Sequence, residues 1–76
     1  MPPEDDVRLI FGRKLRQLRL DRGYSQEQLA FRAGLHRTYV SSAERGQRNV
    51  SLVNLDRLAK ALGVAVGDFF TRSRRR

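Results

Sequence analysis

The sequence predicts an all-α domain built from five short helices. Apolar residues recur at helical spacing in successive stretches, and glycines follow these stretches at positions 23, 34, 46 and 63, where a left-handed C-terminal cap is expected. Alternating strand patterns and Asn-Gly hairpin turns are absent from the sequence. The 76 residues suit one small domain, which we expect over 6–71 between a short N-terminal extension, 1–5, and a basic tail, 72–76.

The first predicted helix covers residues 6–22. Asp5 and Asp6 favour its N-terminal end because negative charge there complements the helix dipole. One face carries apolar residues at helical spacing, namely Val7, Phe11, Leu15 and Leu18. Gly12 weakens the helix slightly, and the sequence gives no compensating reason for it.

The second predicted helix begins at Ser25 and ends at Gly34. Ser25 and Gln28 have the spacing of a capping box, in which each side chain satisfies a free backbone donor. The inward residues are Leu29, Ala30 and Ala33. A tight turn at Gly34-Leu35 follows, and we expect Leu35 to fill the space between the two helices it joins.

The third predicted helix covers residues 37–45, with His36 at the N-cap position. Val40 and Ala43 face inward, while the other face carries the polar residues Arg37, Thr38, Ser41 and Ser42.

The fourth predicted helix begins at Ser51, an N-cap candidate, and has an apolar face of Leu52, Leu55, Leu58, Ala59 and Leu62. The fifth is short, 66–71, and contains Phe69 and Phe70.

The net charge of +8 indicates a polyanionic partner. Half of it comes from four arginines near the C-terminus, Arg72, Arg74, Arg75 and Arg76. We expect a solvated end there, with extra phosphate contacts as the alternative. Charge alone does not separate DNA, RNA and an acidic membrane surface. The apolar runs are too short to cross a membrane, and the acidic start does not resemble a signal peptide, so we expect a cytoplasmic protein.

Enzymatic and metal chemistry find no support in the sequence. It contains no Cys and only one His, so no set of metal ligands and no nucleophile–His set can be assembled. Glycine-rich phosphate loops are also missing. We therefore expect neither an enzyme nor a bound cofactor.

Two short helices joined by a tight turn are typical of a helix-turn-helix, whose second helix enters the major groove of DNA. Residues of the third helix able to meet base edges are Arg37, Thr38, Tyr39, Ser41 and Ser42. Each could also be an ordinary surface residue, and Tyr39 fits the edge of the core as well as DNA. Candidates for phosphate contacts, which set the register of the helix, are Gln26, Gln47, Arg48, Asn49 and Ser51.

Residues 11–70 resemble the phage Cro and repressor type of helix-turn-helix domain, the XRE-like family with a lambda-repressor-like fold. The resemblance lies in Tyr24-Ser25-Gln26, Leu29-Ala30, Gly34-Leu35, Glu44-Arg45-Gly46 and the stretch from Asn54 to Val64. Within that family, residues 35–42 and 46–52 are most similar to controller proteins of restriction–modification systems. Those proteins are dimers without a ligand domain that bind operators upstream of their own gene and of the restriction gene.

The resemblance implies roles for individual residues. Gln26 would contact phosphate, Arg37, Thr38 and Ser42 would read bases, and Tyr39 would lie near the operator centre. Arg48 and Asn49 would contact the DNA backbone. Arg19 and Glu44 match a structural ion pair between the first helix and the recognition helix. Ala43 departs from the family, which has a larger aliphatic residue there, and this implies a cavity or a compensating neighbour such as Tyr39 or Phe31.

Apolar residues beyond the needs of a small core predict a homodimer through Val50, Leu52, Val53 and Phe70. A dimer predicts a pseudo-palindromic operator. Bound beside a promoter, it would contact or block RNA polymerase, with no small-molecule effector. An alternative is an antitoxin or small repressor that acts through a protein partner. Duplex RNA is disfavoured because side chains cannot read its major groove.

Overall fold

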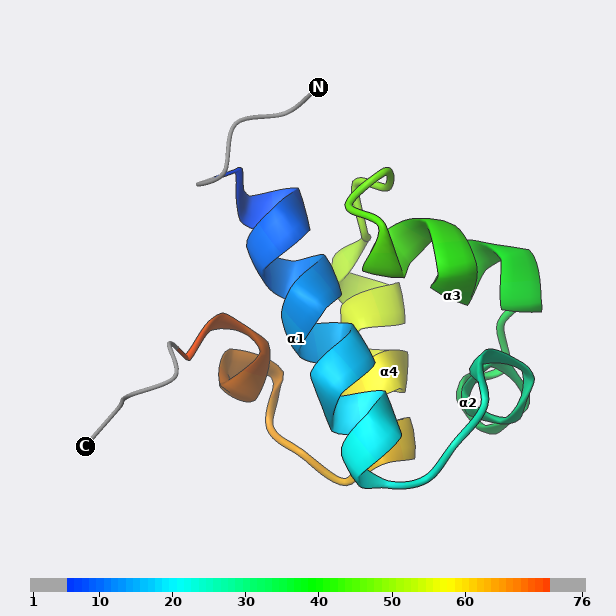
Figure 1. The fold of residues 1–76 in the computed structure, drawn as a ribbon. Helices are drawn as coiled ribbons and strands as arrows, with labels where there is room; N and C mark the ends of the chain where they lie inside the picture. The colour runs from blue at the N-terminus through cyan, green and yellow to red at the C-terminus, as the bar shows by residue number, and fades with distance from the viewer. Residues whose placement is uncertain (1–5, 72–76) are drawn as a thin grey trace.

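The computed structural model describes residues 6–71 and contains four α-helices followed by one short 3-10 helix (Figure 1). In chain order these are α1 (Val7–Asp21), α2 (Gln26–Ala33), α3 (Arg37–Glu44), α4 (Leu52–Leu62) and η1 (Val66–Phe70). No strand occurs in residues 6–71, so the all-α class is confirmed. The predicted extension, 1–5, and the predicted basic tail, 72–76, lie outside the described residues.

The prediction of five α-helices is wrong in its last member. Residues 66–70 form a 3-10 helix, because this segment is short and contains Gly67. The Asp68 carboxylate accepts a hydrogen bond from the Ala65 backbone N–H at 3.0 Å and closes the turn. This turn places Phe69 in the core, where its ring meets that of Phe11 edge to face at a centroid distance of 4.9 Å.

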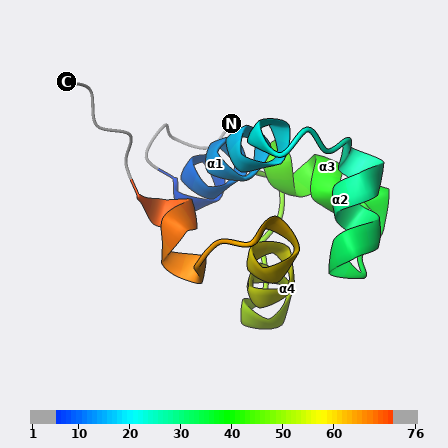
Figure 2. The same ribbon diagram turned by 90° about the horizontal axis from the view of Figure 1, so that it is seen from below.

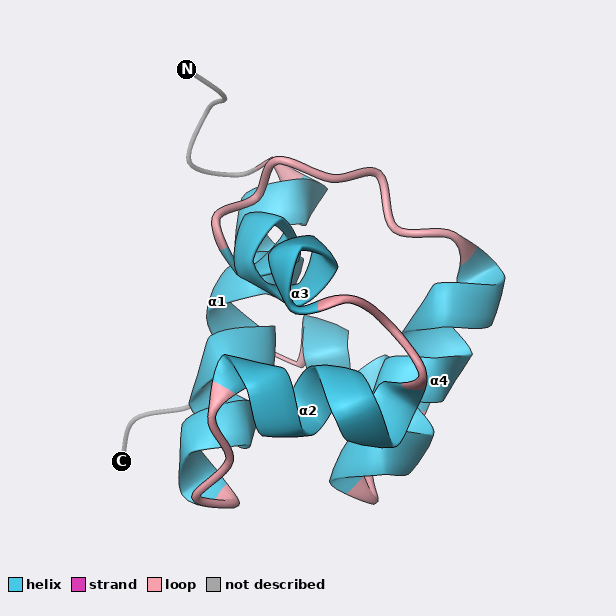
Figure 3. Cartoon of the chain, turned by 90° about the vertical axis from the view of Figure 1, so that its right-hand side faces the viewer, coloured by secondary structure: helices cyan, strands magenta, loops and turns pink. Residues whose placement is uncertain are grey.

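The helices surround one apolar core. α2 and α3 lie on one side of α1, and η1 lies on the other (Figures 1 and 2). Seen from the side of α2 and α3, the loop after α3 passes over the molecule to reach α4 (Figure 3). The buried apolar residues are Phe11, Leu15, Leu29, Ala30, Ala33, Val40, Ala43, Leu55, Leu58, Ala59, Leu62 and Phe69.

The first turn of α1 is fixed by Asp6. Its carboxylate accepts from the Arg8 backbone N–H at 2.8 Å and also pairs with the Arg8 guanidinium. These hydrogen bonds lower the pKa of Asp6 from 3.8 to about 2, and the same contact raises the pKa of Arg8. The prediction that Val7 packs inward is wrong, because this first turn extends past the core and leaves Val7 58% exposed.

Local capping signals are confirmed in two helices. Ser25 and Gln28 form the predicted capping box, with bonds of 3.0 and 2.8 Å. The Ser51 hydroxyl accepts from the Asn54 backbone N–H at 3.1 Å and caps α4. His36 occupies the N-cap position of α3, but its side chain makes no capping hydrogen bond.

Candidate DNA-binding surface

α2 and α3 form a helix-turn-helix with a three-residue turn. Gly34 has a φ of +72°, which a residue with a side chain rarely adopts, and it ends α2. The Leu35 backbone N–H then donates to the Ala30 carbonyl at 2.8 Å, and the Leu35 side chain packs against the core. His36 is extended and turns the chain into α3.

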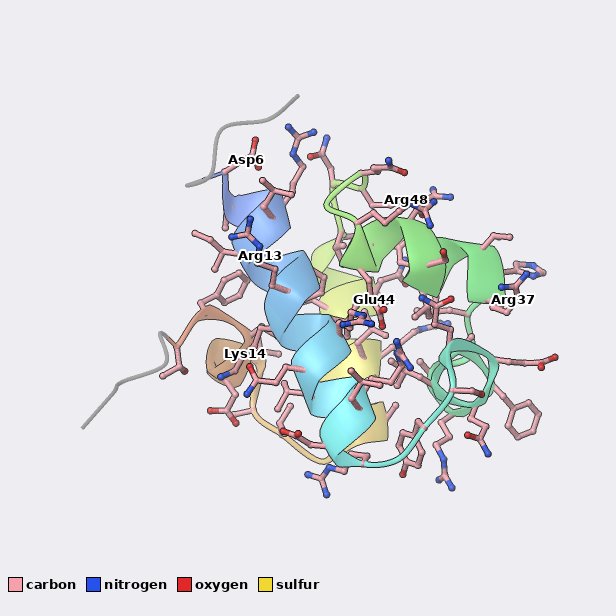
Figure 4. All side chains as sticks on the ribbon, viewed as in Figure 1. Asp6, Arg13, Lys14, Arg37, Glu44 and Arg48 are labelled. Atoms are coloured by element: carbon pink, nitrogen blue, oxygen red, sulfur yellow. The ribbon has the colours of Figure 1, made fainter. Side chains whose placement is uncertain are left out.

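The outer face of α3 carries the predicted base-reading residues. Arg37 and Thr38 are exposed, whereas Tyr39, Ser41 and Ser42 are half-buried. Val40 and Ala43 are buried on the opposite face. Figure 4 shows Arg37 at the end of α3 that is farther from α1. The exposed guanidinium and hydroxyl can both form hydrogen bonds with a base edge.

Ser42 and Arg48 are joined into one cluster with Tyr39. The Arg48 Nε donates to the Ser42 hydroxyl at 2.8 Å, and the Arg48 guanidinium lies 4.8 Å from the centre of the Tyr39 ring. The Ser42 hydroxyl in turn donates to the Thr38 carbonyl at 3.0 Å. The Ser42 hydroxyl therefore both donates and accepts a hydrogen bond within the protein. Arg48 reaches back from the following loop to the Tyr39 ring on α3.

Three other phosphate candidates occupy the rest of that loop. Gln47, Asn49 and Ser51 are all exposed, and Ser51 also caps α4. Arg45, which the sequence did not single out, donates to the Ser41 hydroxyl and to the Gln47 amide oxygen. The Ser41 hydroxyl therefore accepts from an arginine that follows α3, as the Ser42 hydroxyl does from Arg48.

A buried ion pair joins α1 to the C-terminal end of α3. The Arg19 Nε lies 2.6 Å from one Glu44 carboxylate oxygen, and Nη2 lies 3.0 Å from the other. The third donor, Nη1, reaches the Tyr24 carbonyl at 2.9 Å. Arg19 is only 7% exposed, and no buried side-chain polar atom in the described part of the chain lacks a partner.

Gln26 belongs to the same network, which the sequence did not indicate. Its Nε2 donates to the Glu44 carboxylate at 3.1 Å. The first residue of α2 is therefore held to the last residue of α3 through a side chain. The spacing of Gln26 and Glu44 in the sequence carries no signal for this contact, because it depends on how the two helices cross.

Gly12 lies where α1 meets the backbone of Ala43 at the end of α3. A Cβ on Gly12 would lie 2.6 Å from the backbone oxygens of Ala43 and Glu44, so α1 passes directly against the end of α3. Only glycine permits this approach. Phe31 does not compensate for the small Ala43, because Phe31 is 86% exposed, whereas Ala43 is 1% exposed and Tyr39 is half-buried. The close approach also supplies the reason for Gly12 that the sequence lacks.

Two of the residues predicted to form a dimer interface, Val50 and Phe70, line a shallow groove. Leu52, Val53 and Phe70 are 82%, 62% and 42% exposed, whereas Val50 is half-buried against the core. The groove measures roughly 190 Å³, and its apolar lining comes from Val7, Phe11, Val50, Leu55 and Phe70. Arg48 lines it as well, so one loop borders both this groove and the outer face of α3.

Within residues 6–71, no group of three or more His, Cys, Asp or Glu side chains could hold a metal ion. No helix in the same residues is long and apolar enough to cross a membrane.

Comparisons with known proteins agree with this geometry. The helix-turn-helix family model matches residues 15–69. The control protein C.BamHI of Bacillus amyloliquefaciens is 55% identical over 65 residues, which cover 84% of this chain and 80% of that protein. The control protein C.SmaI of Serratia marcescens is 46% identical over 76 residues, and this alignment covers 95% of this chain and 90% of that protein.

A solved structure supports the same assignment. The restriction–modification controller protein C.AhdI from Aeromonas hydrophila superposes with a TM-score of 0.81 at 54% identity, covering 83% of this chain and 96% of that one. The resemblance to restriction–modification controller proteins is thus confirmed, and the chain belongs to the helix-turn-helix family of the XRE-like type.

Proposed function

We propose that this chain is a sequence-specific, DNA-binding transcriptional regulator that acts as the homodimeric controller protein of a restriction–modification operon. The observation that carries the proposal is the exposed polar face of α3, fixed at its end by α1 through Gly12 and the Arg19–Glu44 pair. The similarity to C.BamHI and C.AhdI supports the regulatory role.

Base reading is assigned to the exposed part of α3. Arg37 can donate two parallel hydrogen bonds to O6 and N7 of guanine, and Thr38 can meet a thymine methyl group or a base acceptor. Both side chains are exposed. Tyr39, Ser41 and Ser42 contribute more indirectly, because Arg45 and Arg48 already hold Ser41 and Ser42.

Phosphate binding is assigned to both ends of the helix-turn-helix. The free backbone N–H groups at the start of α2 favour an anion, and Gln26 lies at that position. Gln47, Arg48, Asn49 and Ser51 would contact the backbone from the loop after α3. These contacts fix the register of α3 and carry no sequence information themselves.

The groove beside η1 supports the homodimer. Val50 and Phe70 line it, Leu52 and Val53 are exposed in the first turn of α4, and a second copy related by a two-fold axis would cover them. Two recognition helices would then meet half-sites about one helical turn apart. Such a dimer beside a promoter would contact or block RNA polymerase in the cytoplasm, without a small-molecule effector.

Selection of bound duplexes from a random DNA pool tests the proposal. The expected result is an inverted repeat whose half-site centres lie about one turn apart. The Arg37→Ala variant should lose preference at one guanine position in each half-site. Recovery of unrelated sequences would overturn the proposal and favour a module that acts through a protein partner.

A further inference from the structure

We propose that α1 is an additional DNA-binding element, in which Arg13 and Arg16 bind backbone phosphates beside the recognition helix. This inference rests on the proposed DNA-binding function, since it takes α3 as the helix that enters the major groove. No residue of the helix-turn-helix itself is involved.

One side of α1 is in direct contact with the end of α3. Gly12 lies against the backbone of Ala43 and Glu44, and Arg19 pairs with Glu44. Leu9 fills the space beside Gly46, where a Cβ would lie 2.5 Å from the leucine side chain. These contacts give α1 a fixed position relative to the outer face of α3.

Arg16 and Arg13 are placed by helical geometry at the edge of this contact. Arg16 follows Gly12 by four residues and precedes Arg19 by three, so it lies on the same side of α1 as both. Arg13 follows Leu9 by four residues and is its neighbour on the helix surface. Both arginines are exposed. Figure 4 shows Arg13 on α1 and Glu44 at the junction of α1 and α3.

The charge of these two residues is available to a ligand. Two other arginines of α1 are engaged, Arg8 with Asp6 and Arg19 with Glu44. Arg13 and Arg16 form no ion pair or hydrogen bond with another residue of the described part. Within residues 6–71, two guanidinium groups without an acidic partner thus stand beside a helix whose own last turn carries no basic residue.

DNA phosphates are the occupant that fits this position. A helix that enters the major groove is flanked by the two sugar–phosphate backbones, and α1 is packed against the end of that helix. Residues three apart on a helix have Cβ atoms about 5–6 Å from each other, so the two arginines can bind neighbouring phosphates of one strand. Guanidinium groups bind phosphate strongly because they form two parallel hydrogen bonds.

The test compares the salt dependence of DNA binding for two double variants with equal loss of charge. Arg13→Gln/Arg16→Gln removes the proposed contacts. Lys14→Gln/Arg22→Gln is the control, because Lys14 lies on another side of α1, near η1 (Figure 4), and Arg22 lies beyond its end, close to Gly63. Thermal unfolding of both variants checks that they fold.

The expected result is a slope of log affinity against log salt that falls by about two for the first variant and is unchanged for the control. The affinity of the Arg13→Gln/Arg16→Gln variant for DNA should fall by about tenfold or more at physiological salt. The loss should be equal for operator and scrambled duplexes, since phosphate contacts carry no sequence information. The single variants Arg13→Gln and Arg16→Gln should each lower the slope by about one.

Equal slopes for the two double variants would overturn the role of α1. This outcome is distinct from failure of the proposed function. If the unmodified protein did not prefer operator over scrambled DNA, the regulatory proposal would fail, and the slopes on scrambled DNA would still decide whether α1 binds phosphate.

Discussion

Removal of the Glu44 carboxylate should strongly lower the free energy of unfolding. In the Glu44→Ala variant the Arg19 guanidinium loses two hydrogen bonds, of 2.6 and 3.0 Å, and Gln26 loses one of 3.1 Å. Arg19 is 7% exposed, so water does not readily replace these partners. Breaking a buried pair in this way costs about 3–5 kcal/mol.

That cost is a large part of the total stability, which for 76 residues is on the order of 4–11 kcal/mol. The melting temperature should fall by at least about 12 °C in a calorimetric or circular dichroism scan. Glu27→Ala is the matched control, because Glu27 is an exposed acid in the first turn of α2. This control should change the free energy of unfolding by less than about 0.5 kcal/mol.

A double variant separates a buried charge from lost packing. Arg19→Met/Glu44→Leu removes both charges and should regain much of the stability that Glu44→Ala loses, because a buried pair can be replaced by apolar residues at little cost. A loss below about 1 kcal/mol for Glu44→Ala would refute the reasoning, since that is the value of an exposed ion pair.

Four further substitutions test other contacts. Arg37→Ala should cost about 1–3 kcal/mol at one guanine-containing position and relax specificity there, and an equal loss on all sequences in a binding titration would make Arg37 a phosphate contact. Arg48→Ala should reduce the salt slope by about one, and an unchanged slope would remove Arg48 from the interface. Gly12→Ala should lower the free energy of unfolding, because an overpacking cost of about 1–3 kcal/mol exceeds a helix-propensity gain of about 1 kcal/mol. A variant that is more stable in a urea titration would contradict the 2.6 Å approach of α1 to α3. The pKa of Asp6 is lowered from 3.8 to about 2, so its contribution to stability is full above the higher value and is lost as pH falls through the lower one. The Asp6→Asn variant should keep the cap and lose less melting temperature over this pH range. Identical pH profiles for the variant and the unmodified protein would contradict this role of Asp6.

Local signals in the sequence account for the N-terminal caps of α2 and α4. The capping box of Ser25 and Gln28 and the cap at Ser51 involve residues within one turn of each other, so spacing alone identifies them. The apolar face of α4 is buried as predicted except at Leu52, which lies in the first turn and is 82% exposed. Helix ends extend beyond the core, and periodicity does not show where the core stops.

Contacts between distant elements could not be predicted in the same way. Gly12 looks like a weak point in α1 until α3 is placed against it. Gln26 reads as a phosphate ligand, but whether it also reaches Glu44 depends on the crossing of two helices. The contacts of Arg48 with Tyr39 and Ser42 depend on the path of the loop after α3, and that loop has no periodic sequence pattern. Each of these features results from tertiary packing.

A gel-shift titration tests the central claim most directly. The purified protein is titrated on the DNA upstream of its own gene and on a scrambled duplex of equal length at physiological salt. The account predicts a preference of about a thousandfold or more for the upstream DNA, with a shifted band whose stoichiometry is two chains per operator. Equal, weak and salt-sensitive binding to both duplexes would contradict it, because charge alone would then account for the binding.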